Sequence, residues 1–201
     1  MNRRSAIGVT GTPCTGKKSV APLLASLLGR ELVDINSVAR ATLGRHHPKR
    51  ANDPLLVDLP RLRTSLRDRG LRGALVSGHL LPDLLGKRDL GFVAVLRCEP
   101  LELRARLEAR GYSHVKLVDN LEAELIGLVL DDSIRAFGAE KVHEYDTTGA
   151  NPAAVAELIA RDYRSGEPQA RPWIDWTLSY YSADRLRLLL SPGETRGPAT
   201  T

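Results

Sequence analysis

The feature that most constrains this chain is a glycine-rich stretch directly after an apolar run near its start. The run is "AIGVT" (6–10), the stretch is "GTPCTGKKS" (11–19), and a helical pattern follows as far as Gly29. Glycines between a strand and a helix let backbone N–H groups surround phosphate oxygens at the N-terminus of the helix. The sequence therefore predicts a phosphate-binding loop followed by a helix over 16–28.

The loop matches the P-loop pattern in its first part and departs from it at the end. The pattern requires Gly, four residues, Gly, Lys and then a hydroxyl residue that holds Mg²⁺. Gly11, Gly16 and Lys17 fit, but Lys18 stands at the hydroxyl position and Ser19 comes one residue late. We predict that the loop binds nucleotide phosphates and that Lys17 bridges the outer ones.

Lys18 raises the question of how a metal ion is held. At about 4 Å from a divalent cation, and at an effective dielectric constant near 20, its charge is repelled by roughly 8 kcal/mol. Lys18 must then swing away or neutralise phosphate itself. Pro22 removes the helical hydrogen bond to the Lys18 carbonyl, so we expect a loosened first turn that lets Ser19 approach the metal. Simple packing of Ser19 is the alternative.

Short apolar runs alternate with amphipathic segments, which is typical of a parallel sheet covered by helices. Five runs are predicted strands: 6–10, 31–35, 73–78, 91–98 and 141–145. We expect further helices over 59–70, 101–110, 118–136 and 152–163. The predicted fold is α/β, with three layers and a central parallel five-stranded sheet flanked by helices. Its runs at 73–78 and 91–98 are the most apolar, so we expect them in the interior.

Composition indicates the cellular location and the surface charge of the chain. The chain has 201 residues, a net charge of +5 and only two cysteines, which suit reduced thiols. It has no run of 18 apolar residues and no signal peptide pattern, so we predict a cytoplasmic protein without a membrane span. The excess of arginine indicates either solvated surfaces or a surface that meets phosphate.

Several P-loop classes can be set aside. GTPases read their base with Asn-Lys-x-Asp, which is absent, and the chain is short for a motor or transporter ATPase. Small P-loop kinases remain, and they need arginines that neutralise phosphoryl charge and a lid that excludes water. Arg40 follows the second strand, where such kinases hold the acceptor. Arg104, Arg106 and Arg110 precede a Gly-Tyr break that could act as a lid hinge, although a solvated helix face explains any one of them.

Three stretches resemble a known family. "VLRCEPLELRARLEARGYSHVKLVDNLEAE" (95–124), "SGHL" (77–80) and "EYDTTGANPAAVAELI" (144–159) are similar to the small archaeal and eukaryotic adenylate kinases. The resemblance spans about residues 5–164. It implies a nucleoside monophosphate kinase that converts ATP and AMP into two ADP, has ATPase activity and supports small ribosomal subunit maturation. It also implies transient contact with the small-subunit platform protein of the ribosomal S11 family and with pre-rRNA.

The resemblance and the residue patterns together give candidate roles. The catalytic candidates are Lys17, Arg110, Arg106 and His79. The candidate ATP-binding residues are Gly11, Thr12, Pro13, Cys14, Thr15, Gly16, Lys17, Lys18, Ser19, Arg110 and Thr148, and Asp34 and Arg40 are expected to bind AMP. Ser19 is the candidate ligand of Mg²⁺.

Two departures from the family fall on metal handling. The family has two hydroxyl residues where this chain has Lys18 and Ser19, and the Asp of its Asp-x-His motif is Ser77 here. We therefore expect ATP with Mg²⁺ at an altered metal site. Asp34 is a candidate substitute carboxylate, although surface capping explains it equally well. His79 would polarise phosphate or position water, or else bond to backbone. The basic stretch "HHPKR" (46–50) replaces an acidic stretch of the family.

These observations predict two parts of the chain. Residues 1–164 would form the kinase domain, with an acceptor segment at about 34–57 and a lid at about 109–119. Residues 165–201 would form an aromatic helix, which we expect to cover an apolar patch of its own domain, and a flexible tail.

The alternative function is a nucleotide-gated ribosome-assembly factor that docks through Trp173, Trp176, Tyr180 and Tyr181. Kinases of dephospho-coenzyme A or shikimate are disfavoured by "ARGY" and "DTTG".

Overall fold

The computed structural model describes residues 5–43, 58–166 and 173–191. The loop predicted over 45–54, with its basic stretch 46–50, and the tail beyond residue 191 lie outside these residues. Within the described ranges, no helix is long and apolar enough to cross a membrane.

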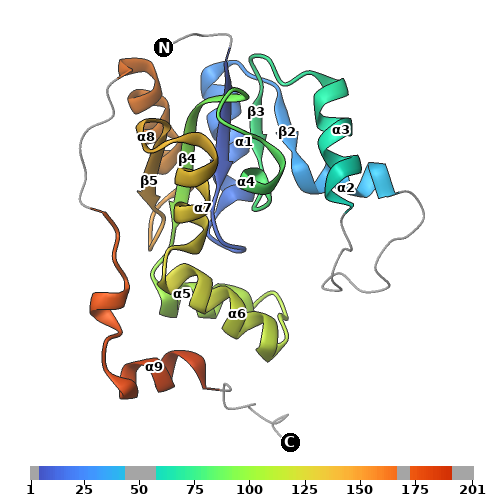
Figure 1. Cartoon of the computed structure of the whole chain (residues 1–201). Helices are drawn as coiled ribbons and strands as arrows, with labels where there is room; N and C mark the ends of the chain where they lie inside the picture. Colours follow the sequence, from blue (N-terminus) through green and yellow to red (C-terminus); the bar gives the residue numbers. More distant parts are fainter. Residues whose placement is uncertain (1–4, 44–57, 167–172, 192–201) are drawn as a thin grey trace, which may run out of the picture.

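A single parallel sheet of five strands forms the centre of the molecule (Figure 1). Its strands are β1 (Ala6–Thr10), β2 (Leu32–Asp34), β3 (Leu75–Ser77), β4 (Leu90–Arg97) and β5 (Val142–Asp146), in the order β2-β3-β1-β4-β5. All neighbouring pairs are parallel. The predicted fold is confirmed, and β3 and β4 lie in the interior as expected from their apolar runs.

Helices cover both faces of the sheet, which gives three layers (Figure 1). One face packs against α1 (Lys17–Leu28) and α8 (Pro152–Ser165), and the other packs against α2 (Ile35–Leu43), α3 (Leu59–Arg69), α4 (Leu81–Leu84) and α7 (Leu128–Phe137). Alternate residues of β1 point to opposite faces: Ile7 and Val9 belong to the core under α1, and Ala6 belongs to the other core. The period-2 pattern of the strand therefore builds two separate cores.

Local sequence explains where α1 begins and ends. It follows Gly16, whose φ is 103°, and it ends at Gly29, whose φ of 60° is left-handed. The Gly29 region closes the helix because its N–H groups bond to the carbonyls of Ala25 and Ser26. The predicted end of this helix is confirmed.

One predicted helix is wrong. The segment 118–136 was expected to be continuous, but it consists of α6 (His114–Leu125) and α7, with a break at Gly127. Gly127 has a φ of 68°, and a Cβ there would lie 3.4 Å from Nη1 of Arg97. The chain turns at Gly127 beside the buried Arg97. Hydrophobic periodicity cannot predict such a turn.

The helices α5 (Pro100–Glu108) and α6 extend past the carboxyl ends of the strands and form a third apolar cluster. Residues 173–191, hereafter the C-terminal segment, contain a short 3₁₀ turn (Thr177–Ser179) and α9 (Ala183–Leu190). Tyr180 and Leu189 of this segment are buried in the third cluster. Arg104 of α5 donates from Nη1 to the carbonyl of Leu188 at 2.6 Å. The segment thus lies on α5 and α6 (Figure 1).

Candidate functional site

The phosphate loop joins the end of β1 to the start of α1 at the carboxyl edge of the sheet. A Cβ at Gly11, where φ is 137°, would lie 2.3 Å from the carbonyl oxygen of Leu96, so only glycine fits. Cys14 is held at a φ of 70°, which L side chains rarely adopt. The loop is therefore a tightly constrained turn whose N–H groups gather at the N-terminus of α1.

Lys17 lies folded into this loop. Its Nζ donates to the carbonyl oxygens of Gly11 at 2.5 Å and Thr12 at 2.8 Å. Burial lowers the pKa of Lys17 to about 8, and the nearby Glu124 carboxylate opposes this shift. A phosphate in the loop would favour the charged form of this lysine.

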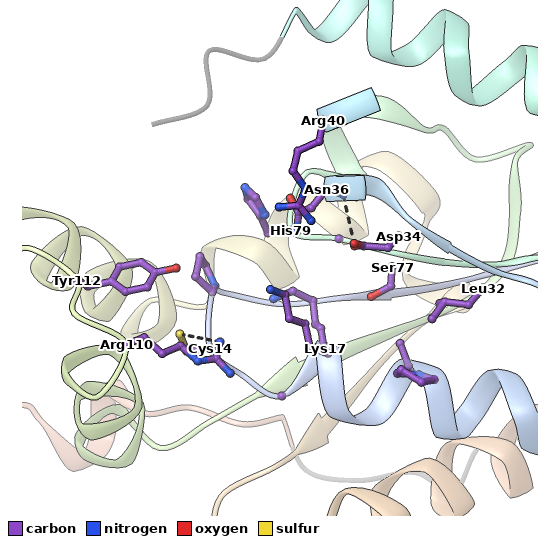
Figure 2. A pocket seen from close by; sticks show the side chains of 16 residues that line it. Cys14, Lys17, Leu32, Asp34, Asn36, Arg40, Ser77, His79, Arg110 and Tyr112 are labelled. Atoms are coloured by element: carbon purple, nitrogen blue, oxygen red, sulfur yellow. Dashed lines mark hydrogen bonds between the residues drawn. The ribbon is translucent and has the colours of Figure 1, made fainter. Parts of the chain in front are cut away.

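A cavity of about 510 Å³ opens in front of the loop. Hereafter it is the main cavity. Figure 2 shows Arg40 and His79 on one side of it, Arg110 and Tyr112 on the other, and Lys17 between them. These side chains come from α2, the turn after β3, the α5–α6 connection and α1. The topology thus brings predicted donor-side and acceptor-side residues around one space.

Positive charge dominates the main cavity. Among the described residues, Lys17, Lys18, Arg40 and Arg110 line it together with one carboxylate, that of Asp34. Such a lining favours an anionic ligand with more than one phosphate group.

The Asp34 carboxylate caps the beginning of α2. It accepts hydrogen bonds from the N–H of Asn36 at 3.3 Å, the N–H of Ser37 at 3.2 Å and the Ser37 hydroxyl at 2.7 Å. Capping was one of the two interpretations of this residue, and the structure bears it out. Asp34 also lines the main cavity, so its predicted contact with AMP stays open.

His79 follows β3 and is partly buried at the wall of the main cavity. Burial and, to a lesser extent, the charge of Lys17 lower the pKa of His79 to about 4. The imidazole is therefore neutral at pH 7 and can present one donor and one acceptor nitrogen. Ser77, two residues earlier, is buried and lines the same cavity.

A second cavity of about 270 Å³ lies on the other side of the loop, next to the turn after β5. Its lining includes Ser19, Arg106, Arg110 and Thr147. Ser19 is thus grouped with this second cavity, whereas Lys18 lines the main cavity together with Ser77. The two consecutive residues of α1 face different spaces.

Arg106 joins the second cavity to the phosphate loop. Its Nη2 donates to the carbonyl of Thr147 at 2.8 Å, and its Nη1 lies 3.4 Å from the carbonyl of Cys14. Arg110 donates from Nη1 to the sulfur of Cys14 at 3.3 Å and lines both cavities. Arg106, which precedes the predicted lid, and Arg110, which belongs to it, therefore both contact the loop directly.

All predicted site residues except Thr148 belong to the phosphate loop or line one of the two cavities. Thr148 lines neither cavity: its hydroxyl oxygen accepts from the N–H of Glu99 at 2.9 Å. Its neighbour Thr147 lines the second cavity instead and was missed, although it belongs to the "DTTG" stretch. Glu124 was also missed. Its hydrogen bond to Thr12 joins residues 112 positions apart, so no local pattern reveals it.

Comparison with known proteins agrees with this geometry. The AAA domain family matches residues 7–127. A protein named "Putative adenylate kinase" from Thermococcus onnurineus is 35% identical over 175 residues, which cover 87% of this chain and 92% of that protein. A protein of the same name from Natronomonas pharaonis is 36% identical over 156 residues, covering 76% of this chain and 86% of its own length.

Solved structures with a similar fold include shikimate kinases. The enzyme from Acinetobacter baumannii, solved in complex with shikimate, has a TM-score of 0.54 and 25% identity and covers 81% of this chain and 94% of its own. The shikimate kinase from Aquifex aeolicus has a TM-score of 0.52 at 16% identity, covering 80% of this chain and 96% of its own. The latter likeness concerns the fold alone.

Proposed function

The chain belongs to the P-loop family of the archaeal proteins named "Putative adenylate kinase", and from this premise we propose that it transfers a phosphoryl group from ATP to AMP, giving two ADP. The observation that supports this most strongly is the main cavity. Lys17 of the phosphate loop and Arg40 of the acceptor side line the same space, so donor and acceptor phosphates would meet between them.

In this proposal the triphosphate of ATP lies on the phosphate loop, with its base toward the second cavity. The phosphate of AMP lies beside Arg40. An oxygen of AMP attacks the γ-phosphorus in line, and the bond from that phosphorus to the β-phosphate oxygen breaks. Lys17 and Arg110 neutralise the transferring group, with Arg106 fixing the loop. The chain contributes positioning and charge, and no covalent enzyme intermediate is involved.

P-loop kinases use ATP with Mg²⁺, and we propose that the metal site of this chain is altered. Lys18 and Ser77 stand in the main cavity where the family pattern has a hydroxyl and a carboxylate, and the Asp34 carboxylate already accepts three hydrogen bonds. Within the described ranges, no group of three His, Cys, Asp or Glu side chains could hold a metal ion. This donor set suits a phosphate better than a protein-held divalent cation. Ser19 stays the candidate ligand from α1.

The test is ADP formation from ATP and AMP by the purified protein, with and without Mg²⁺. The variant Lys17→Met should reduce turnover by at least a hundredfold, because it removes the cation next to the transferred phosphates. Lys87→Met is the matched control: Lys87 pairs with Glu140 on the exposed surface and lines neither cavity. Equal turnover of both variants would refute the role of Lys17.

A second function is supported by a different observation. The C-terminal segment leaves large apolar side chains exposed, among them Trp173 (61%), Leu178 (73%) and Tyr181 (83%). In this second function the surface docks a small-subunit ribosomal protein of the S11 family or pre-rRNA, as the family resemblance implies. The chain would then act in the cytoplasm and hydrolyse ATP. Tight ADP binding without turnover would favour this assembly role over the kinase.

A further inference from the structure

A buried group of three charged side chains lies behind the phosphate loop. Arg97, at the end of β4, donates from Nε to Oε1 of Glu124 at 2.8 Å and from Nη1 to Oε1 of Glu144 at 2.5 Å. Arg97 is 2% exposed and Glu124 is 1% exposed. This group is called the ion cluster below. None of its three members lines the main cavity or the second cavity.

The ion cluster contacts the phosphate loop through Glu124. Oε2 of Glu124 accepts a hydrogen bond from the hydroxyl of Thr12 at 2.6 Å, and its Oε1 also accepts from the N–H of Cys98 at 3.0 Å. The Thr12 side chain is therefore turned toward the cluster, while its carbonyl accepts from Lys17. The Glu124 carboxylate thus fixes Thr12, whose carbonyl accepts the hydrogen bond from Lys17.

The same cluster contacts the C-terminal segment through backbone groups. The N–H of Ile174 donates to Oε2 of Glu144 at 3.2 Å, and the carbonyl of Ile174 accepts from Nη1 of Arg97 at 3.3 Å. Two carboxylates share one guanidinium, so the cluster has an excess of negative charge. Burial raises the pKa of Glu144, and the hydrogen bond from the Ile174 N–H and the charge of Arg97 oppose this shift. An extra N–H donor from the segment stabilises such a cluster.

We propose that the ion cluster positions the phosphate loop for nucleotide binding and that the C-terminal segment completes it. The route runs from Thr12 through Glu124 and Arg97 to Glu144 and Ile174. Each step is a hydrogen bond or an ion pair given above. The segment is then a working part of the nucleotide site although it lies outside both cavities. This inference rests on the proposed nucleotide binding.

The chain provides its own reporter for this coupling. It contains two tryptophans, and both Trp173 and Trp176 belong to the C-terminal segment. Trp173 and Ile174 line a hollow beside Arg97. A change in tryptophan emission on addition of ADP would therefore report on the segment, since neither tryptophan lines a nucleotide cavity.

The first pair of variants tests the end of the route at the loop. Thr12→Val keeps the shape of the side chain but removes its donor, and Thr12→Ser keeps the hydroxyl. A lost hydrogen bond to a buried carboxylate should weaken ADP binding about tenfold or more in Thr12→Val. It should also abolish the tryptophan response to saturating ADP. Thr12→Ser should restore both.

The second pair tests the end of the route at the segment. Ile174→Pro removes the N–H that Glu144 accepts, whereas Ile174→Ala shortens the side chain and keeps that N–H. We expect the ADP dissociation constant of Ile174→Pro to rise at least threefold above that of Ile174→Ala. Leu178→Ala, at an exposed position, should bind ADP like the unaltered chain. Circular dichroism shows whether each variant is folded.

The outcomes separate this proposal from the proposed function. If the unaltered chain binds no ADP, the proposed nucleotide site itself is wrong. If it binds ADP but its tryptophan emission stays constant, and Ile174→Pro binds as tightly as Ile174→Ala, the coupling is wrong and the kinase proposal stands. If Ile174→Pro does not fold, Glu144→Gln replaces it, with the same expected loss of affinity and the same refuting result.

Discussion

Lys17 changes its charge within the pH range used for enzyme assays. Its pKa of about 8 lies below the ordinary value of 10.5 because the side chain is buried. The folded chain without nucleotide therefore binds fewer protons than the unfolded chain between pH 8 and 10.5, and in that window this lysine makes stability rise with pH. Burial favours the neutral amine of Lys17, whereas a bound phosphate favours the charged ammonium.

ADP affinity should consequently fall above pH 8, by up to about tenfold per pH unit. Isothermal titration calorimetry between pH 7 and 9.5, in buffers of different ionisation enthalpy, should also detect proton uptake on binding above pH 8. Lys17→Arg keeps its charge in this range and serves as the control. Its ADP affinity should not fall between pH 8 and 9.5. An affinity of the unaltered chain that stays constant to pH 9.5 would contradict the assigned pKa.

Lys18 and Ser77 give a second prediction at the scale of single residues. In the double variant Lys18→Thr with Ser77→Asp, a hydroxyl and a carboxylate replace the two departures from the family pattern. ADP binding by this variant should become tighter in Mg²⁺ than in EDTA by about tenfold, whereas the unaltered chain should show little difference. Titration calorimetry in both conditions measures this. Lys18→Arg is the control, because it keeps the positive charge.

The opposite result is informative for the same residues. A double variant whose ADP affinity and turnover ignore Mg²⁺ would mean that the two positions do not handle metal together. Strong dependence of the unaltered chain on Mg²⁺ would mean that another ligand, with Ser19 as the candidate, compensates for them.

At the residue scale, positions could be predicted where the pattern is local. Gly11, Gly16 and Lys17 follow from a short pattern, and Arg40 and Arg110 from their distance to predicted strands and breaks. Gly16, Lys17, Arg40 and Arg110 line the main cavity and Gly11 forms the turn behind it, whereas their roles stay predictions. Glu124 and Ile174 could not be found in this way, because their partners are distant in the chain. Thr148 was predicted and Thr147 was not, because the "DTTG" stretch alone does not show which of two adjacent side chains faces the cavity.

At the scale of elements, the break between α6 and α7 depends on Gly127. Gly127→Ala should lower the free energy of unfolding by about 1–2 kcal/mol, because a left-handed backbone disfavours Cβ. The added methyl group would also lie 3.4 Å from Nη1 of Arg97, in contact with a buried charged group. Urea unfolding followed by circular dichroism measures the loss.

Gly29→Ala isolates the backbone contribution to this effect. Gly29 has a similar left-handed conformation, but a Cβ there would meet nothing within 4 Å. Its substitution should therefore cost less than that of Gly127, and should leave ADP binding unchanged. Equal losses for the two variants would show that contact with Arg97 is irrelevant to the break.

Element boundaries show the same division between local and distant causes. The end of α1 was predicted because Gly29 follows the last helical residue, whereas the helix predicted over 59–70 ends one residue earlier, at Arg69, directly before Gly70. The break at Gly127 was missed because continuous amphipathic spacing persists on both sides of it. The short α4 (Leu81–Leu84) was missed because four residues are too few to establish a period.

At the scale of the whole molecule, the parallel sheet and its three layers were predictable because each apolar run is followed by an amphipathic one. Such alternation permits few topologies. The docking of the C-terminal segment onto α5 and α6 rests on Tyr180 and Leu189, whose partners lie about eighty residues earlier. The sequence predicted a helix there that covers its own domain, but the packing partners of that helix could not be read from the sequence. The division into a domain over 1–164 and an extension stays a prediction.

The strand order has a consequence for the nascent chain. β1 lies in the centre of the sheet, yet both of its neighbours, β3 and β4, are synthesised much later. At about 5–20 residues per second, several seconds pass before β4 has been made. During that time a strand that is fully buried in the folded chain has two unpaired edges, which is the condition under which polypeptides associate wrongly. We therefore expect the growing chain to depend on chaperones until Arg97 has left the ribosome.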